Sequence, residues 1–564
     1  MPIMRQWRMR AAMIIAFLPA ACGGQNNQVT SPRDAMATVT PEESQVGAYL
    51  AGQHALHEHD FKAASRYYGN ALRVDPTNVS LLKRTYALLA AEGNLDEAIT
   101  LVERLKALKE EDPVAGIMLA TRAARDENYA EVERIMAIQP RQGFNKFIAP
   151  LMLAWSRAGQ GRIDAALETV NDLKKSNSLT TLSHFHSGMI NDMAHRPAAA
   201  AKHYDMVIAS EGALSLRALE IIGAFYRRTG QPDKVQALRD LYVNENPATV
   251  LLTEPEDKAT AGMTPRTGFA ETLFGIANSI REESATDAAL LFSRLALAVQ
   301  PDFALAQVLT GDILHAQTRF ADANAVYRAI GQESAVYYLA RLRMAGSLYK
   351  SGPPKEAMAV LEALAQQWPE QTQALIDLGD ILRSEKRFAE AALAYGKALV
   401  RLPVLKKYHW RVFYSRGIAH ERSQQWAAAE KDFLKALEME PDQPMVLNYL
   451  GYSWLEQRTN LLQAKDMLQR AVAQRPEDGS IVDSLGWALY LTGDYPGAVQ
   501  ELERAVELES NDPTVNDHLG DAYWRAGRRK EARFQWQRAL SLNPEEPGIQ
   551  ENIRRKLERG LDPE

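Results

Sequence analysis

The chain has 564 residues, of which 46% are hydrophobic and 24% are charged, and its formal net charge is -6. This composition is typical of a folded chain with ample apolar material for a core, which excludes a largely disordered polypeptide. Acidic residues outnumber basic ones, so the chain lacks the excess of positive charge typical of nucleic-acid-binding proteins, and no basic patch interleaved with aromatic residues is visible. Nucleic acid is therefore excluded as the expected partner.

The first residues have the layout of a secretory signal. Arg5, Arg8 and Arg10 precede the short apolar run "AAMIIAFLPAAC", which ends in small residues. This order of charged start, apolar middle and small-residue end is typical of a signal peptide, and the run is too short to span a membrane. We therefore expect residues 1–21 to be a signal peptide.

The only cysteine, Cys22, follows that run directly, and a single cysteine cannot form an intramolecular disulfide. The arrangement resembles a bacterial lipoprotein signal, in which the cysteine after the cleavage site carries the lipid. Gly23 in place of an aspartate then implies the outer membrane, and residues 22–44 read as a polar tether facing the periplasm. Pro19 departs from the aliphatic residue usual at that place. The alternative is a soluble periplasmic protein in which Cys22 is incidental or lost with the signal.

A motif recurs along most of the remaining chain. The segments "NYLGYSW", "SLGWALY" and "DHLGDAYW" place Gly451, Gly486 and Gly520 at intervals of about 34 residues. An alanine follows each glycine about twelve residues later, then a large residue and a second alanine. The same frame gives the following glycine, alanine, large residue, alanine and proline sets: Gly417, Ala429, Phe433, Ala436, Pro441; Gly379, Ala391, Tyr395, Ala398, Pro403; Gly52, Ala64, Tyr68, Ala71, Pro76.

This pattern resembles the tetratricopeptide repeat, and the resemblance covers most of the chain. It implies an all-α solenoid of stacked antiparallel helix pairs, with about 14 repeats in two arrays. Small residues at the glycine and alanine positions let the paired helices approach closely, and we expect Gly486 to face Ala498. Terminal prolines end the second helix of a unit.

Counting in frame predicts the domain organisation. A degenerate array of about six units occupies residues 45–249, and a more regular array of about eight units occupies 268–546. Between them, residues 250–267 carry two prolines and several charges, which predicts a linker. Residues 547–564 are expected to form a capping helix and tail with a polar outer face.

Residues for catalysis or metal binding are scarce. His54 and His57 could share one helix face, but they fall where the first helix of a unit ends and polar residues are simply solvated. No phosphate-binding glycine loop, HExxH, GxSxG or CxxC motif is visible. We therefore expect no catalytic residues, no metal, no cofactor and no enzyme activity.

In the tetratricopeptide family, the first helix of each unit lines the concave face and contacts ligands. Carried onto this sequence, that resemblance implies the following peptide-binding or partner-binding residues: Asn448, Tyr452, Asp483, Trp487, Tyr490, Asp517, Asp521 and Trp524. They would form an aromatic strip edged with acids, in which aromatic anchors supply affinity and carboxylates select basic residues. The alternative is that the tryptophans pack between neighbouring units.

Together with the signal, the repeats resemble the envelope tetratricopeptide lipoproteins of Gram-negative bacteria, including adaptors that bring cell-wall hydrolases to a periplasmic carboxyl-terminal processing protease. The resemblance implies a non-enzymatic scaffold with protein partners, attached to the membrane through its N-terminal lipid alone. The alternative is a structural component of an envelope assembly, in exopolysaccharide export, a pilus or outer-membrane biogenesis.

Overall fold

The computed structural model describes residues 44–58, 60–176, 179–210, 214–245, 262–281, 286–544 and 548–562. Their regular structure is helical, and no strand occurs among them. The predicted signal, Cys22 and nearly all of the tether lie outside these residues, as do residues 250–261 of the predicted linker. Within the described part, no helix is both long and apolar enough to cross a membrane.

Within the described residues the helices form the antiparallel pairs counted below, and we call the first member of each pair the A helix and the second the B helix. Six pairs precede residue 250: α1 (Gln45–His57) with α2 (Phe61–Val74), α3 (Val79–Ala91) with α4 (Leu95–Ala107), α5 (Pro113–Arg125) with α6 (Tyr129–Ala137), α7 (Asn145–Gly159) with α8 (Ile163–Asn171), α9 (Thr180–Met193) with α10 (Pro197–Ile208), and α11 (Leu216–Arg228) with α12 (Pro232–Glu245).

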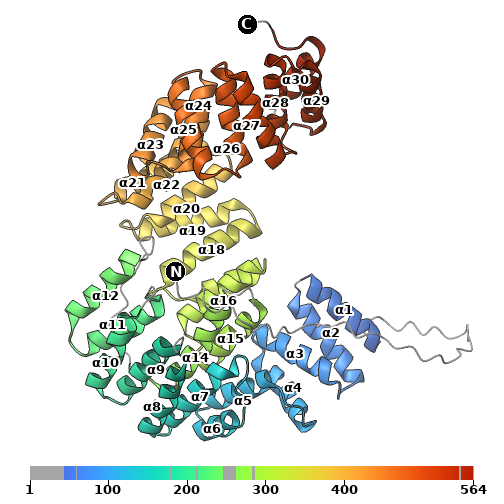
Figure 1. The fold of residues 1–564 in the computed structure, drawn as a ribbon. Coiled ribbons are helices and arrows are strands. Elements are labelled where there is room, and N and C mark those ends of the chain that lie inside the picture. The colour runs from blue at the N-terminus through green and yellow to red at the C-terminus, as the bar shows by residue number, and fades with distance from the viewer. Residues whose placement is uncertain are drawn as a thin grey trace, which may run out of the picture. The chain divides into compact units, whose positions relative to one another are not determined.

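Eight pairs follow: α14 (Pro265–Arg281) with α15 (Thr286–Val299), α16 (Ala304–Ala316) with α17 (Phe320–Ala329), α18 (Tyr337–Ser351) with α19 (Pro354–Gln367), α20 (Gln373–Ser384) with α21 (Phe388–Arg401), α22 (Trp410–Arg422) with α23 (Trp426–Met439), α24 (Pro444–Glu456) with α25 (Leu461–Gln474), α26 (Gly479–Leu491) with α27 (Tyr495–Leu508), and α28 (Pro513–Arg525) with α29 (Arg529–Ser541). A last helix, α30 (Ile549–Arg559), follows them. The predicted all-α solenoid of helix pairs is confirmed (Figure 1).

Local sequence explains where these helices begin and end. Pro513 occupies the first turn of α28, and the Asp512 carboxylate accepts hydrogen bonds from the backbone N–H groups of Thr514 and Val515. Proline fits the first helical turn because its missing N–H would have no intrahelical partner there. Gly493 and Gly527 make the turns between A and B helices with φ of 83° and 82°, a left-handed conformation that glycine adopts without strain.

Close packing inside a pair depends on the repeated glycine. A Cβ atom at Gly486 of α26 would stand 2.5 Å from Leu502 Cγ of α27, so a side chain has no room there. The expectation that Gly486 faces Ala498 is corrected by this contact. Leu502 is longer than alanine, so its side chain crosses the interface and fills the space that the glycine leaves.

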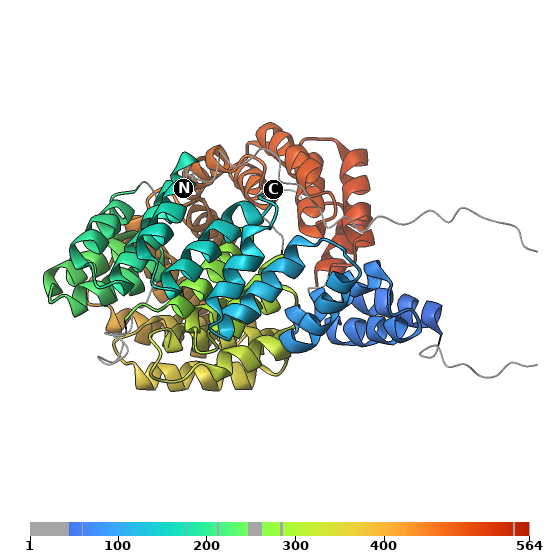
Figure 2. The same cartoon turned by 90° about the horizontal axis from the view of Figure 1, so that it is seen from below.

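Contacts divide the chain into two compact units, Met1–Val360 and Leu361–Glu564. This boundary lies inside α19, away from the predicted linker at 250–267, whose last three residues already belong to α14. In the first unit α14 and α15 pack against the A helices α3, α5 and α7 (Figures 1 and 2). The first array therefore buries part of its A-helix side against the chain's own later helices.

Two buried contacts of α14, one apolar and one ionic, hold it in this arrangement. Gly268 of α14 lies against the indole of Trp155 on α7 so closely that a Cβ atom would overlap it. The Arg217 guanidinium on α11 donates to the Glu271 carboxylate on α14 at 2.7 Å, and Glu271 is only 5% exposed. A buried pair of this kind positions the two elements that carry it, because either charge alone would be costly to bury.

Candidate functional site

All eight residues predicted to bind a partner lie on the A helices α24, α26 and α28 of the second unit. Asn448, Asp483 and Asp517 each stand three residues before the repeated glycine of their helix. Residues at i and i+3 project about 60° apart around a helix, so this repeated position lies beside the glycine that contacts the paired B helix. We call this side of α22, α24, α26 and α28 the A-helix face of the second unit.

Three rings form a stack at the centre of this face. The indole of Trp487 lies 4.7 Å from the Tyr490 ring at an angle of 8°, and 4.1 Å from the His518 ring at 12°. Trp487 and Tyr490 are half-buried and pack against the hydrophobic core of the unit. Trp487 therefore packs on its neighbours and also keeps a solvent-accessible surface. It combines a packing role between repeats with exposure on the face predicted to bind a partner.

His518 joins this stack to a buried ion pair. Its Nδ1 lies 3.0 Å from both carboxylate oxygens of Asp483, and both side chains are buried. Burial lowers the pKa of His518, but the charge and hydrogen bond of Asp483, with Asp517 and Asp521 further away, outweigh it and the net pKa is raised. Asp483 is thus already bound to His518 inside the protein.

The two acids on α28 are bound to α30. Lys556 Nζ donates to Asp517 at 2.7 Å and to Asp521 at 2.8 Å, and the Trp536 Nε1–H donates to Asp521 at 2.8 Å. Burial raises the pKa of Asp521, Lys556 lowers it and Asp517 raises it, with a result of about 6. For Lys556, burial lowers the pKa but the two carboxylates outweigh it, and the pKa is raised.

These contacts change the role expected for the acids. A carboxylate selects a basic residue of a partner when it is free to pair, and here Asp483 already pairs with His518 while Asp517 and Asp521 share Lys556. The A-helix face therefore offers aromatic surface more than acidic surface.

Trp524 supports the end of the fold. Its ring centroid lies 5.2 Å from that of Trp536, and the Arg529 guanidinium carbon lies 3.9 Å from its ring centroid. Gly560, just after α30, lies so close to the indole that a Cβ atom would overlap it. Trp524 is half-buried among these contacts, so its main role here is to hold the C-terminal helix in place.

Asn448 and Tyr452 of α24 are both half-buried. Among the described residues, the Asn448 Oδ1 atom is buried and has no hydrogen-bond partner. A buried acceptor without a donor costs about 1–3 kcal/mol, which the packing around Asn448 must offset.

The sequence analysis missed aromatic residues that extend the face. Tyr414 of α22 and Tyr449 of α24 meet edge to face with ring centroids 5.9 Å apart, and the Tyr449 hydroxyl donates to Glu421 at 3.1 Å. Tyr414 stands three residues before Gly417, and both Tyr449 and His518 stand two before their glycines. Applying the repeat pattern to the unit that contains Gly417, and to the position two residues before each glycine, would have identified all three residues.

Among the described residues, no group of three or more histidine, cysteine or acidic side chains is placed to hold a metal ion. The A-helix face is thus built of stacked rings and internal ion pairs, an arrangement suited to binding a polypeptide.

Comparison with known families agrees with the fold. Tetratricopeptide repeat profiles match residues 49–113, 342–403 and 414–460, and further profiles described as TPR repeat and tetratricopeptide repeat match 486–527 and 513–546. Over these segments the chain consists of tetratricopeptide repeats. Such a solenoid is a scaffold suited to protein–protein interaction.

One curated relative is the TPR repeat-containing protein PA4667 of Pseudomonas aeruginosa, 28% identical over 164 residues. The match covers 29% of this chain and spans only 27% of that relative's length.

Solved structures with similar helix arrangements include three repeat proteins. The first is the APC/C hetero-tetramer Cut9-Hcn1 (14% identity, TM-score 0.37, 94% of this chain and 99% of that one). The second is yeast Tom70 (14% identity, TM-score 0.32, 92% and 95%). The third is YrrB, described as a TPR protein with an unusual peptide-binding site (18% identity, TM-score 0.29, 35% and 97%).

Proposed function

We propose that this protein is a non-enzymatic adaptor that binds a segment of a partner protein along the A-helix face of its second unit. The observation that carries the proposal is the row of half-buried rings on three consecutive A helices: Tyr414, Tyr449, Trp487 and Tyr490. Rigid aromatic side chains supply large contact area at a low entropic cost, which makes them effective anchors for a polypeptide. In the first unit, α14 and α15 already cover much of the corresponding side.

The face selects its partner mainly by apolar contact. Because the nearby carboxylates Asp483, Asp517 and Asp521 already have internal partners, a segment with aromatic or aliphatic anchors fits this face better than a strongly basic one.

We propose further that the adaptor works in the bacterial envelope, at the periplasmic side of the outer membrane, with a lipid on Cys22. The support is the N-terminal sequence, in which a charged start and an apolar run precede the single cysteine. On the resemblance to envelope lipoprotein adaptors, the proposed partners are a carboxyl-terminal processing protease and the cell-wall hydrolases it cleaves. Holding both on one solenoid would raise their effective concentration without any new chemistry.

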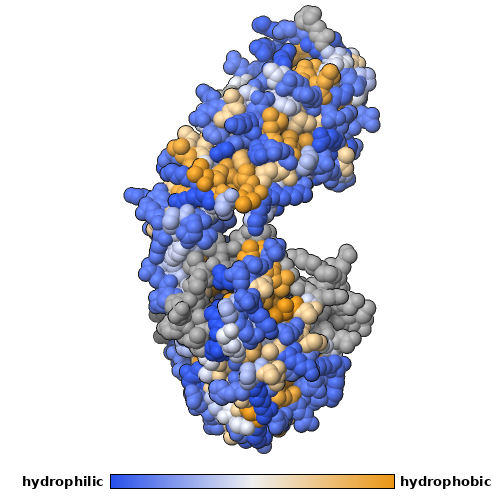
Figure 3. Space-filling view, turned by 90° about the vertical axis from the view of Figure 1, so that its left-hand side faces the viewer, coloured by the Kyte–Doolittle hydropathy of each residue, from blue (hydrophilic) through white to orange (hydrophobic). Residues whose placement is uncertain are grey.

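One surface favours a structural role in an envelope assembly as a second candidate. Apolar side chains are exposed on α21, α23 and the segment after α21: Leu393, Val400, Val404, Leu405 and Leu434. Val400 is 87% exposed and Val404 is 67% exposed. Apolar surface gathers on this side of the second unit (Figure 3), and such patches mark interaction sites.

A pull-down from crosslinked envelopes tests the adaptor proposal. The full chain is compared with a Trp487→Ala, Tyr490→Ala variant, and with Phe534→Ala, which removes an exposed ring from the B helix α29, as matched control. All three proteins are first checked for equal helicity and melting temperature. We leave Trp524 intact because it holds α30.

Loss of a protease or wall hydrolase from the double variant alone supports the adaptor. If the same partners remain bound, the A-helix face is not the binding site. Partners lost instead from a Val400→Glu, Val404→Glu variant would favour the structural candidate. Metabolic labelling with a fatty acid, compared between the natural chain and Cys22→Ser, tests the lipid, and equal labelling of both would contradict it.

A further inference from the structure

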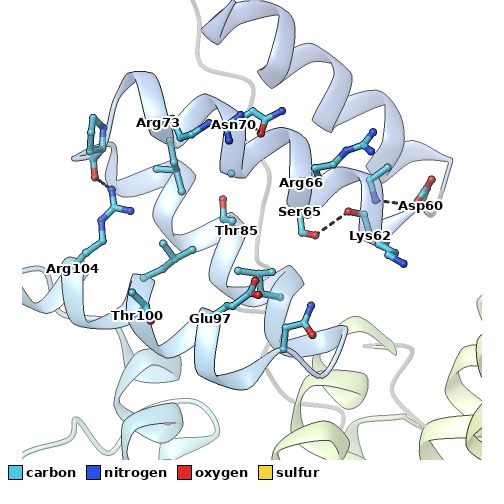
Figure 4. A pocket seen from close by; sticks show the side chains of 17 residues that line it. Asp60, Lys62, Ser65, Arg66, Asn70, Arg73, Thr85, Glu97, Thr100 and Arg104 are labelled. Carbon is cyan, nitrogen blue, oxygen red and sulfur yellow. Dashed lines mark hydrogen bonds between the residues drawn. The ribbon is translucent and has the colours of Figure 1, made fainter. Parts of the chain in front are cut away.

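The first unit contains a groove separate from the A-helix face of the second unit. It lies between the B helices α2 and α4, and its volume is about 1070 Å³. Figure 4 shows Arg66, Asn70 and Arg73 on one side and Glu97, Thr100 and Arg104 on the other. Thr85 and Leu89 of α3 line it between the two helices. A groove of this size exceeds most small-molecule sites and suits a stretch of polypeptide.

A glycine keeps the groove open. Gly69 is in the middle of α2, where glycine costs about 1 kcal/mol relative to alanine. The neighbouring Gly52 of α1 is required by packing, since a Cβ atom there would stand 2.8 Å from the Tyr68 ring. At Gly69, in contrast, a Cβ atom would meet nothing within 4 Å. Packing does not explain this glycine, whereas the depth of the groove beside it does.

The charge of the groove points to an acidic ligand. Four basic side chains line it, Lys62, Arg66, Arg73 and Arg104, against two acidic ones, Asp60 and Glu97, which gives a net charge of +2. The whole chain has a net charge of -6, so the groove is a local exception. The Asp60 carboxylate is already engaged, because it accepts from the Ala63 N–H at the start of α2 at 2.9 Å.

The basic side chains are not neutralised within the described part of the protein, where none of the four pairs with a carboxylate. Arg73 donates to the Asn70 amide oxygen at 2.7 Å, and Arg104 donates to the Pro76 carbonyl. Both acceptors are neutral, so both guanidinium charges remain available. Guanidinium groups bind carboxylates in a bidentate way that neutral acceptors cannot match.

We propose that the groove between α2 and α4 binds a segment of a partner protein that carries acidic side chains. Carboxylates of the segment pair with Arg66, Arg73 and Arg104, and its smaller apolar side chains contact Leu72, Leu89 and Leu101 in the lining. This site is additional to the proposed function. It gives the adaptor a second binding site, which selects acidic segments, whereas the A-helix face selects apolar ones.

Selection from a display library of short random peptides, with the full-length protein as bait, tests the proposal. Peptides enriched on the natural chain are then measured on Gly69→Leu, whose added side chain fills the groove while leucine favours the helix more than glycine does. Gly346→Leu is the matched control, since Gly346 is an exposed helical glycine of α18 that also has nothing within 4 Å of its Cβ position.

The expected result is a family of peptides rich in aspartate and glutamate whose binding weakens about tenfold or more on Gly69→Leu and on Arg66→Glu, Arg73→Glu, and is unchanged on Gly346→Leu. Their affinity should also fall as salt is added.

The proposal is overturned if no acidic family is enriched, or if acidic peptides bind Gly69→Leu as tightly as the natural chain. The Trp487→Ala, Tyr490→Ala variant separates the two sites: groove peptides still bind it, whereas ligands of the A-helix face do not. If one of the two proposed sites does not bind its ligand, the binding result for the other site can therefore still be interpreted.

Discussion

Asp483 on α26 and His518 on α28 form a buried ion pair between consecutive repeats, with Nδ1 at 3.0 Å from each carboxylate oxygen. The pair lies under the Trp487 ring and joins the two A helices that carry most of the candidate site. Its charge state therefore affects both the stability of the second unit and the shape of its face.

The stabilisation from this pair should depend on pH. Burial lowers the pKa of His518, but Asp483 outweighs it, so the folded pKa lies above the unfolded value of about 6.5. The contribution is then fully present below about pH 6.5 and is lost as pH rises through the folded pKa. Urea unfolding of the natural chain and His518→Gln at about pH 6 and about pH 9 measures it. The stability gap between the two proteins should be larger at the lower pH, and an equal gap would show that folding leaves the pKa of His518 unchanged.

Lys556→Met should destabilise the second unit strongly. The substitution leaves Asp517 and Asp521 close together without a counter-charge, and breaking a buried pair costs about 3–5 kcal/mol. The deficit should shrink as pH falls below about 6, because Asp521 already has a pKa near that value and a protonated carboxyl needs no cation. Denaturant unfolding followed by tryptophan fluorescence measures it. Lys530→Met removes an exposed charge from α29 and should have no effect, and a similar loss there would point to a general charge effect.

Two helical glycines should respond to alanine in opposite directions. Gly486→Ala places a Cβ atom 2.5 Å from Leu502 Cγ, and such overpacking costs about 1–3 kcal/mol. Gly69→Ala meets no atom within 4 Å and should stabilise the chain by about 0.5–1 kcal/mol, because alanine favours the helix. Urea unfolding of both variants checks the signs, and a stabilising Gly486→Ala would mean that the α26 and α27 interface has spare room.

Glu271→Gln should loosen α14 from the first unit. Glu271 is buried and accepts a hydrogen bond from Arg217, so removing its charge should lower the stability of the first unit by about 3 kcal/mol. This is the low end for a broken buried pair, because Glu220 still contacts Arg217. Hydrogen exchange of the α14 amides should speed up while that of α26 stays unchanged. Arg134→Gln breaks an exposed pair with Glu131 and should change neither. Unchanged exchange in α14 would mean that Trp155 and the apolar contacts hold it without the ion pair.

The repeat motif predicted most of the fold. Each glycine and alanine marks a contact between paired helices, so the local sequence carries the pairing, the register and the side of the A helix on which Trp487 and Tyr490 lie. The motif also predicted about six helix pairs before residue 250 and about eight after it. It did not place the compact boundary, because the packing of α14 on α7 depends on residues more than a hundred positions apart, such as Gly268 and Trp155.

The sequence by itself determined that the chain forms helix pairs, where each pair begins and which residues share a face, because helical periodicity and close-packing positions are local properties of the chain. Only the tertiary structure decided which charges on that face remain available. Asp483 is bound by His518, 35 residues away, and Asp517 by Lys556, 39 residues away. Those pairings depend on how successive repeats stack, and the same stacking, with Gly69 left open between α2 and α4, decides where a groove remains.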